Sequence, residues 1–74
     1  MEWFKVSNDK YISEIGIILV QENKTCSCYF SAAVKNRYAL NNRLLANCVD
    51  LEAAKLILQH KYDVLTGKTQ NIAY

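Results

Sequence analysis

Residues 50–67 constrain the fold of this chain most, because they form its only long and regular helical pattern. Asp50 can accept hydrogen bonds from the free N–H groups of a first helical turn. Gly67 can adopt the left-handed conformation in which helices commonly end. Between these caps, apolar side chains recur at helical spacing and share one face: Leu51, Ala53, Ala54, Ile57, Leu58, Tyr62, Val64 and Leu65. Because such a face needs an apolar partner, the sequence predicts a helix packed against another layer of structure.

Two side chains depart from the pattern of this helix. Lys61 projects from within the apolar arc, so we expect its aliphatic stem to pack while its ammonium group reaches water. Leu56 falls on the polar side, where an isolated exposed leucine is common in folded proteins. Neither departure by itself indicates a function.

Size and composition limit the chain to one small domain. Its 74 residues, 51% hydrophobic and 22% charged, are typical of a globular protein with a thin core. We expect one domain over residues 1–74, of which residues 68–74 form a polar, flexible tail. A homodimer would supplement the marginal stability of so small a core. The longest apolar run, residues 15–20, is far too short to cross a bilayer, so we expect a cytoplasmic protein with no membrane partner.

The chain before the helix carries strand patterns. Residues 25–34 give the clearest one, because their apolar and polar side chains alternate with a period of two. Further strands are expected at residues 11–21, 38–40 and 44–49, and residues 3–7 are expected to form a short strand or an ordered N-terminal arm. Together with the helix, these patterns predict an α+β fold, in which an antiparallel sheet of three to five strands has one C-terminal helix packed on one face.

Turn chemistry separates the expected strands at residues 7–10, 22–24 and 35–37. Asn41-Asn42 suits a tight hairpin, because asparagine tolerates positive φ. Gly16 lies inside an expected strand and indicates a bulge or the close approach of another backbone. A competing interpretation makes residues 31–46 a helix, and the asparagines at positions 36, 41 and 42 oppose it.

The three cysteines, Cys26, Cys28 and Cys48, are expected to be reduced and buried. The first ten residues contain no apolar leader, which favours a reducing compartment. A zinc site needs paired ligand spacing, and these cysteines together with His60 do not show it. We therefore predict no metal and no cofactor.

No catalytic motif stands out in the sequence. The chain has two glycines, too few for a phosphate-cradling loop, and it lacks a Ser-His-Asp set with nearby partners. Cys48 and His60 are the one conceivable catalytic pair of nucleophile and base, and nothing in the sequence orients the histidine as a base. We therefore expect a protein that is not an enzyme.

The charge distribution points to one candidate binding region. Residues 23–49 contain no acidic residue, although the net charge of the whole chain is only +2. Because they lie in or beside two expected turns that flank a short strand, we assign partner binding to Lys35, Arg37, Tyr38 and Arg43. Three interpretations stay open: cations that protect an edge strand, a surface for an acidic protein, or a surface for nucleic acid.

Residues 38–55, YALNNRLLANCVDLEAAK, resemble a pattern in small phage and prophage accessory proteins. The pattern combines a hairpin turn, a strand with an aliphatic pair, a cap and a helix start, here Asn41-Asn42, Leu44-Leu45, Asp50 and residues 51–55. Cys48 stands where an aromatic residue is usual, and Ala46 stands where glycine is frequent. The resemblance implies the fold expected above and a protein that binds a host protein during host takeover or defence evasion.

The order of strands and helix is also similar to that of the arm-binding domains of phage-type integrases, which read DNA through the sheet. No residue of their basic sheet face has a match here, so the similarity implies no site in this chain.

These observations lead to one expected function and two alternatives. We expect a non-enzymatic phage or mobile-element protein that occludes or modulates a host macromolecule, with a host protein of acidic surface as the favoured partner. The first alternative is a small nucleic-acid-binding module that uses the basic turns. The second is a homodimeric structural subunit that pairs through an exposed edge strand.

Overall fold

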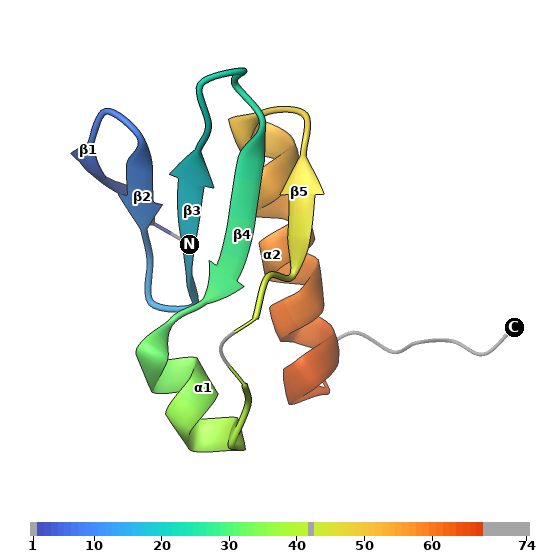
Figure 1. Ribbon diagram of the computed structural model, residues 1–74. Helices are drawn as coiled ribbons and strands as arrows, with labels where there is room; N and C mark the ends of the chain where they lie inside the picture. Colours follow the sequence, from blue (N-terminus) through green and yellow to red (C-terminus); the bar gives the residue numbers. More distant parts are fainter. Residues whose placement is uncertain (1, 42, 68–74) are drawn as a thin grey trace, which may run out of the picture.

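The computed structural model describes residues 2–41 and 43–67, which form an α+β fold (Figure 1). In this part of the chain the strands are β1 (Phe4–Ser7), β2 (Lys10–Ile12), β3 (Gly16–Val20), β4 (Cys26–Phe30) and β5 (Ala46–Cys48). The helices are α1 (Ala32–Tyr38), between β4 and β5, and α2 (Leu51–Thr66). The predicted antiparallel sheet with a C-terminal helix is confirmed, and α1 is an addition to it.

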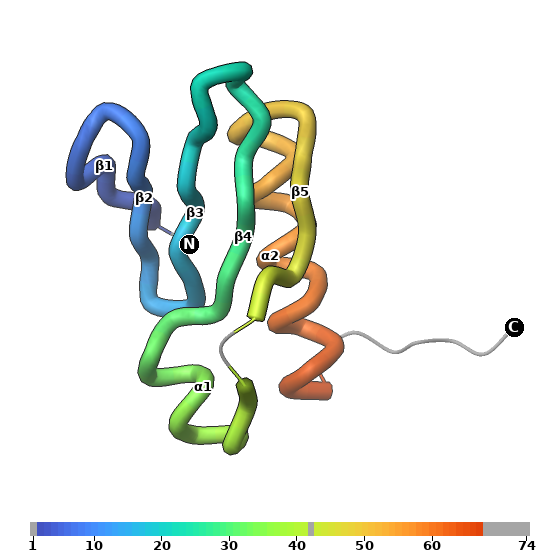
Figure 2. Tube along the Cα trace, in the orientation of Figure 1, coloured from blue at the N-terminus to red at the C-terminus, as the bar shows by residue number. Residues whose placement is uncertain are grey.

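The five described strands form one antiparallel sheet in the order β1-β2-β3-β4-β5. Each strand therefore pairs with its neighbours along the chain, and β1 and β5 are the two edges (Figure 2). Helix α2 packs on one face of β3, β4 and β5, behind them in Figure 1. Helix α1 lies beyond the end of β4 rather than over the sheet (Figure 2).

The core lies between α2 and the sheet. Ile18 from β3 and Leu58 from α2 are fully buried. The other buried hydrophobic side chains come from both layers and from α1: Ile15, Cys26, Cys28, Val34, Cys48 and Ala54. Cysteines thus occupy three of the core positions. They bury less apolar surface there than larger side chains would.

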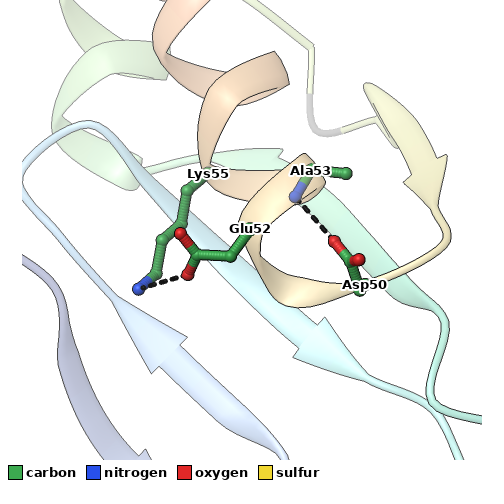
Figure 3. A network of polar contacts seen from close by, with 4 residues as sticks. All are labelled: Asp50, Glu52, Ala53 and Lys55. Carbon is green, nitrogen blue, oxygen red and sulfur yellow. Dashed lines mark hydrogen bonds and ion pairs between the residues drawn. The ribbon is translucent and has the colours of Figure 1, made fainter.

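Helix α2 begins and ends where the sequence predicts. The Asp50 carboxylate accepts a hydrogen bond of 2.8 Å from the Ala53 N–H, and Lys55 forms an ion pair of 3.5 Å with Glu52 (Figure 3). Gly67 has φ +78° and donates its N–H to the last helical carbonyls. Leu56 is exposed, as predicted for the polar side of the helix. None of the described helices is long and apolar enough to cross a membrane.

The single strand expected at residues 11–21 is wrong, because this stretch forms a hairpin of β2 and β3. The Ser13 hydroxyl accepts from the N–H groups of Ile15 and Gly16, both at 3.2 Å, and so closes a tight turn. The turn carries Ile15 into the core. Gly16 is then covered by the Leu58 side chain, and a Cβ at position 16 would lie 2.7 Å from the Tyr29 carbonyl oxygen. The expected close approach is therefore present, made by a side chain as well as by backbone.

The strand expected at residues 25–34 ends early, at Phe30. Ser31 is a helix N-cap, because its hydroxyl accepts from the Val34 N–H at 3.3 Å and donates to the Glu14 carbonyl at 2.9 Å. The expected turn at 35–37 and strand at 38–40 are therefore wrong, since these residues lie in α1 or just after it. The helix proposed as the competing interpretation exists, but only over Ala32–Tyr38.

The region between α1 and β5 differs from the expected hairpin. Ala39 ends α1 in the left-handed conformation, with φ 54°. Asn42 lies outside the described residues, as does the predicted tail at 68–74. The strand expected at 44–49 is shorter, Ala46–Cys48, although the Leu45 N–H still donates to the Cys28 carbonyl at 2.8 Å.

Candidate functional site

The predicted partner-binding residues lie on α1 and on the connection after it, not in two turns beside a strand. Lys35, Arg37 and Tyr38 belong to α1, and Arg43 lies between α1 and β5. Arg37 and Arg43 are exposed, whereas Lys35 and Tyr38 are half-buried and Tyr38 packs against the core. Arg37 and Arg43 line separate depressions. Their common role in partner binding stays a prediction.

A groove lies between the last turns of α2 and the connection that leads to β5. It has a volume of about 470 Å³. We call it the α2 groove, and its lining residues are Phe30, Leu40, Leu45, His60, Lys61, Val64 and Leu65. Most of this lining is apolar, and the volume falls within the range of common ligand pockets.

Cations flank the apolar lining of the α2 groove. Lys61 lines it directly, and Arg43 lines a neighbouring hollow of about 220 Å³ that shares Phe30, Leu40 and Leu45 with it. No acidic side chain is among the described residues that line either depression. Within residues 2–41 and 43–67, no ion pair involves Lys61 or Arg43. Both charges are thus available to an external anion.

None of the predicted partner-binding residues lines the α2 groove, and one of them lies beside it. Arg43 was assigned from the local excess of positive charge, and it lies beside the groove. Phe30, Leu45 and Val64 carry no local signal, because they meet only when β4, the connection and α2 come together. Lys61 is the residue whose position in the sequence indicates the groove, because a lysine inside an apolar helical arc marks the place where that arc reaches solvent.

The three cysteines gather on the helix-covered face of the sheet. Cys26 lies directly opposite Cys48, and the sulfur atoms of Cys28 and Cys48 are 3.9 Å apart. The Cys28 thiol also donates to the Ala54 carbonyl at 3.5 Å. Burial and the neighbouring Cys48 raise the pKa of Cys28 to about 12, and burial raises the pKa of Cys26. These thiols stay protonated at neutral pH, the opposite of what nucleophilic catalysis requires.

Cys48 and His60 do not form a catalytic pair in the described structure. Cys48 is buried in the core, His60 is exposed at the α2 groove, and no hydrogen bond between the described residues joins them. In the same part of the chain, no three His, Cys, Asp or Glu side chains are arranged to hold a metal ion.

Comparison with known proteins adds no relative to this description: no protein-family model matches the chain, and neither the curated proteins nor the solved structures contain a match.

Proposed function

We propose that this chain is a non-enzymatic accessory protein of a phage or mobile element that binds a host protein with an acidic surface. Binding would occlude or modulate that host protein. The phage or mobile-element origin rests on the resemblance of residues 38–55, and the binding role rests on the α2 groove. Of the pattern behind the resemblance, the described structure contains the Asp50 cap and the helix that starts at Leu51.

The observation that carries the binding role is an apolar groove flanked by two cations that form no ion pair within the described part of the chain. Leu45 and Val64 can receive an aliphatic or aromatic anchor, which is how the centre of many interfaces is built. Lys61 and Arg43 can pair with carboxylates beside that anchor. The fitting partner segment is therefore amphipathic and acidic.

The experiment starts with capture of partners from bacterial lysate, with and without nuclease, and continues with the purified partner. The test variant is Arg43→Gln with Lys61→Gln, which removes both flanking charges. We expect its affinity at low salt to fall by about tenfold, mostly through slower association. Affinity of the parent should also weaken as salt rises.

A matched control removes two charges elsewhere. Lys5 on β1 and Lys24 in the β3–β4 turn are both exposed and do not line the α2 groove. Lys5→Gln with Lys24→Gln should therefore change the affinity much less than the groove variant. Equal loss in both variants, or unchanged binding in the groove variant, contradicts the proposal. Loss of every partner after nuclease treatment would favour the nucleic-acid-binding alternative instead.

A further inference from the structure

The sheet face opposite α2 carries a second apolar surface. Along the strand register Phe4 is opposite Ile12, and Ile17 is opposite both Ile12 and Tyr29. Directly opposed side chains of antiparallel strands point to the same face. None of the four belongs to the core or packs against it, whereas their strand neighbours Tyr11 and Ile18 do. The four residues therefore form an apolar row on the face away from α2.

A second row runs beside the first on the same face. Lys10 is opposite Leu19, Leu19 is opposite Ser27, and Ser27 is opposite Asn47. The Ser27 hydroxyl donates to the Asn47 side-chain oxygen at 2.8 Å. The two rows together form what we call the open face: Phe4, Ile12, Ile17 and Tyr29, then Lys10, Leu19, Ser27 and Asn47.

Neither of the described helices lies over the open face (Figure 1). Phe4 is 58% exposed, and Ile12, Ile17, Leu19 and Tyr29 are half-buried by their neighbours within the sheet. Two aromatic and three aliphatic residues in contiguous positions exceed the isolated apolar side chains normal on a surface. Such an uncovered apolar face is typical of a surface that binds another macromolecule.

We propose that this partner is a second copy of the chain, related by a two-fold axis that runs along β3. β3 is the middle strand of the sheet, so the rotation exchanges β2 with β4. Ile17 and Leu19 then meet their own counterparts, and Ile12 meets Tyr29. In the centre of the interface, apolar side chains of one copy thus lie opposite apolar side chains of the other, as an isologous interface requires.

The charges of the open face fit this arrangement. Neither row contains an acidic side chain, and Lys10 is their one cation. The rotation carries Lys10 opposite Ser27 of the other copy. Ser27 is buried and its hydroxyl already accepts from the Gln21 side-chain nitrogen at 3.2 Å, so the group left to accept from the Lys10 ammonium is the exposed side-chain oxygen of Asn47. Like charges do not meet, because the two lysines lie on opposite sides of the axis. Apart from Lys10 the face offers no charged group to a charged partner, so a second copy fits better.

The size of the face sets the strength of the dimer. Five strands at ~4.8 Å spacing and at most five residues per strand at ~3.3 Å give a face of no more than about 24 by 17 Å, or ~400 Å² per copy, because β1, β2 and β5 have only four, three and three residues. Specific stable complexes bury about 1,200–2,000 Å² in total, so we infer a weak dimer. This inference goes beyond the proposed function, because the α2 groove lies on the helix side of the sheet and stays accessible in the dimer.

The unmodified protein gives the first test. Sedimentation equilibrium between about 10 µM and about 1 mM should show the average mass rising towards twice that of the monomer. Amide NMR signals that move with concentration should map to the open face. A monomer throughout this range overturns the inference, as do shifts confined to the outer edge of β1, to the α2 groove or to residues 68–74.

A charge exchange at position 17 tests the axis itself. Ile17→Lys and Ile17→Glu should each weaken self-association by at least about tenfold, because like charges then meet on the axis. An equimolar mixture of the two should dimerise again, whereas Leu56→Lys, an exposed site on α2, should behave as the parent. A dimer that survives Ile17→Lys, or a mixture that stays monomeric, overturns the arrangement. If circular dichroism shows that either variant is unfolded, Leu19→Lys and Leu19→Glu repeat the exchange. Whether the unmodified protein dimerises is decided by the first test in either case.

Discussion

Gly16 is a residue of the sheet that lies directly against the Leu58 side chain of α2. The Leu58 side chain covers it, and the Tyr29 carbonyl of the paired strand leaves 2.7 Å for any added Cβ. The absence of a side chain at position 16 thus lets Leu58 occupy the centre of the core. Size, and not backbone conformation, requires glycine here.

Gly16→Ala should therefore destabilise the fold by overpacking, at a cost of about 1–3 kcal/mol in the free energy of unfolding. Urea unfolding measures this loss. Because Leu58 is the side chain that clashes, Gly16→Ala should cost less in a Leu58→Ala background, even though Leu58→Ala by itself costs about 2–5 kcal/mol. Additive losses in the double variant would show that the two residues do not meet as described.

The Cys28 thiol gives a prediction about pH. Its pKa is raised to about 12 in the folded protein from an ordinary value of 9.0, so the unfolded chain loses this proton first. The stabilisation is complete below about pH 8.5 and is lost as pH rises from there towards 12, by at most about 1.4 kcal/mol per pH unit. Urea unfolding under reducing conditions at about pH 8 and about pH 10.5 measures the fall.

Cys28→Ala is the control for this pH dependence, because it removes the buried thiol and leaves every other titratable side chain in the sequence. The variant should be less stable at neutral pH, since it loses the sulfur contacts to Cys48 and Ala54. Its stability should, however, fall less between the two pH values. Parallel pH curves for parent and variant would show that the buried thiol is not the cause.

At the scale of elements, local signals explain which predictions were confirmed. α2 was predicted to within a residue, because its periodicity and its acidic first turn lie inside the helix and its caps lie directly beside it. The β2–β3 hairpin was missed because the apolar run 15–20 hides a turn that depends on one hydroxyl, that of Ser13. Only the pairing of Ile12 with Ile17 reveals it.

α1 was missed for a different reason. The alternation that begins in β4 continues by chance through Ala32 and Val34, so a period of two persists after the strand has ended. The boundary between β4 and α1 is Ser31. Its hydroxyl accepts a hydrogen bond from the first turn of α1 and donates one to the Glu14 carbonyl. A single capping residue thus determines where the strand ends and the helix begins, although the alternation of apolar side chains continues past it.

Ser31→Ala should cost about 1 kcal/mol of unfolding free energy, because it removes the cap and the bond to the β2–β3 turn together. Ser31→Thr keeps the hydroxyl and should cost less. Chemical denaturation compares the three proteins, and amide exchange in α1 should increase in the alanine variant. An unchanged Ser31→Ala protein would contradict the assignment of residues 32–38 as a helix capped by this side chain.

At the scale of the whole molecule, the sequence predicted one sheet and one covering helix but neither of the two candidate surfaces. The α2 groove needs residues from positions 30, 40–45 and 60–65 to meet, and the open face needs the register of all five strands. Both properties arise from long-range pairing, for which single-residue chemistry carries little information. The predicted cation Arg43 lies beside the groove, in the neighbouring hollow, and it could be predicted because an excess of charge is a local property of the sequence.

The cluster of buried thiols has a consequence for how the motions of this protein can be observed. Cys26, Cys28 and Cys48 are all buried while α2 covers the sheet. An alkylating reagent can modify them only in states where this layer has opened, and the thiols must then also ionise. The alkylation kinetics of the unmodified chain therefore report the lifetime and frequency of separation between helix and sheet, without any introduced label.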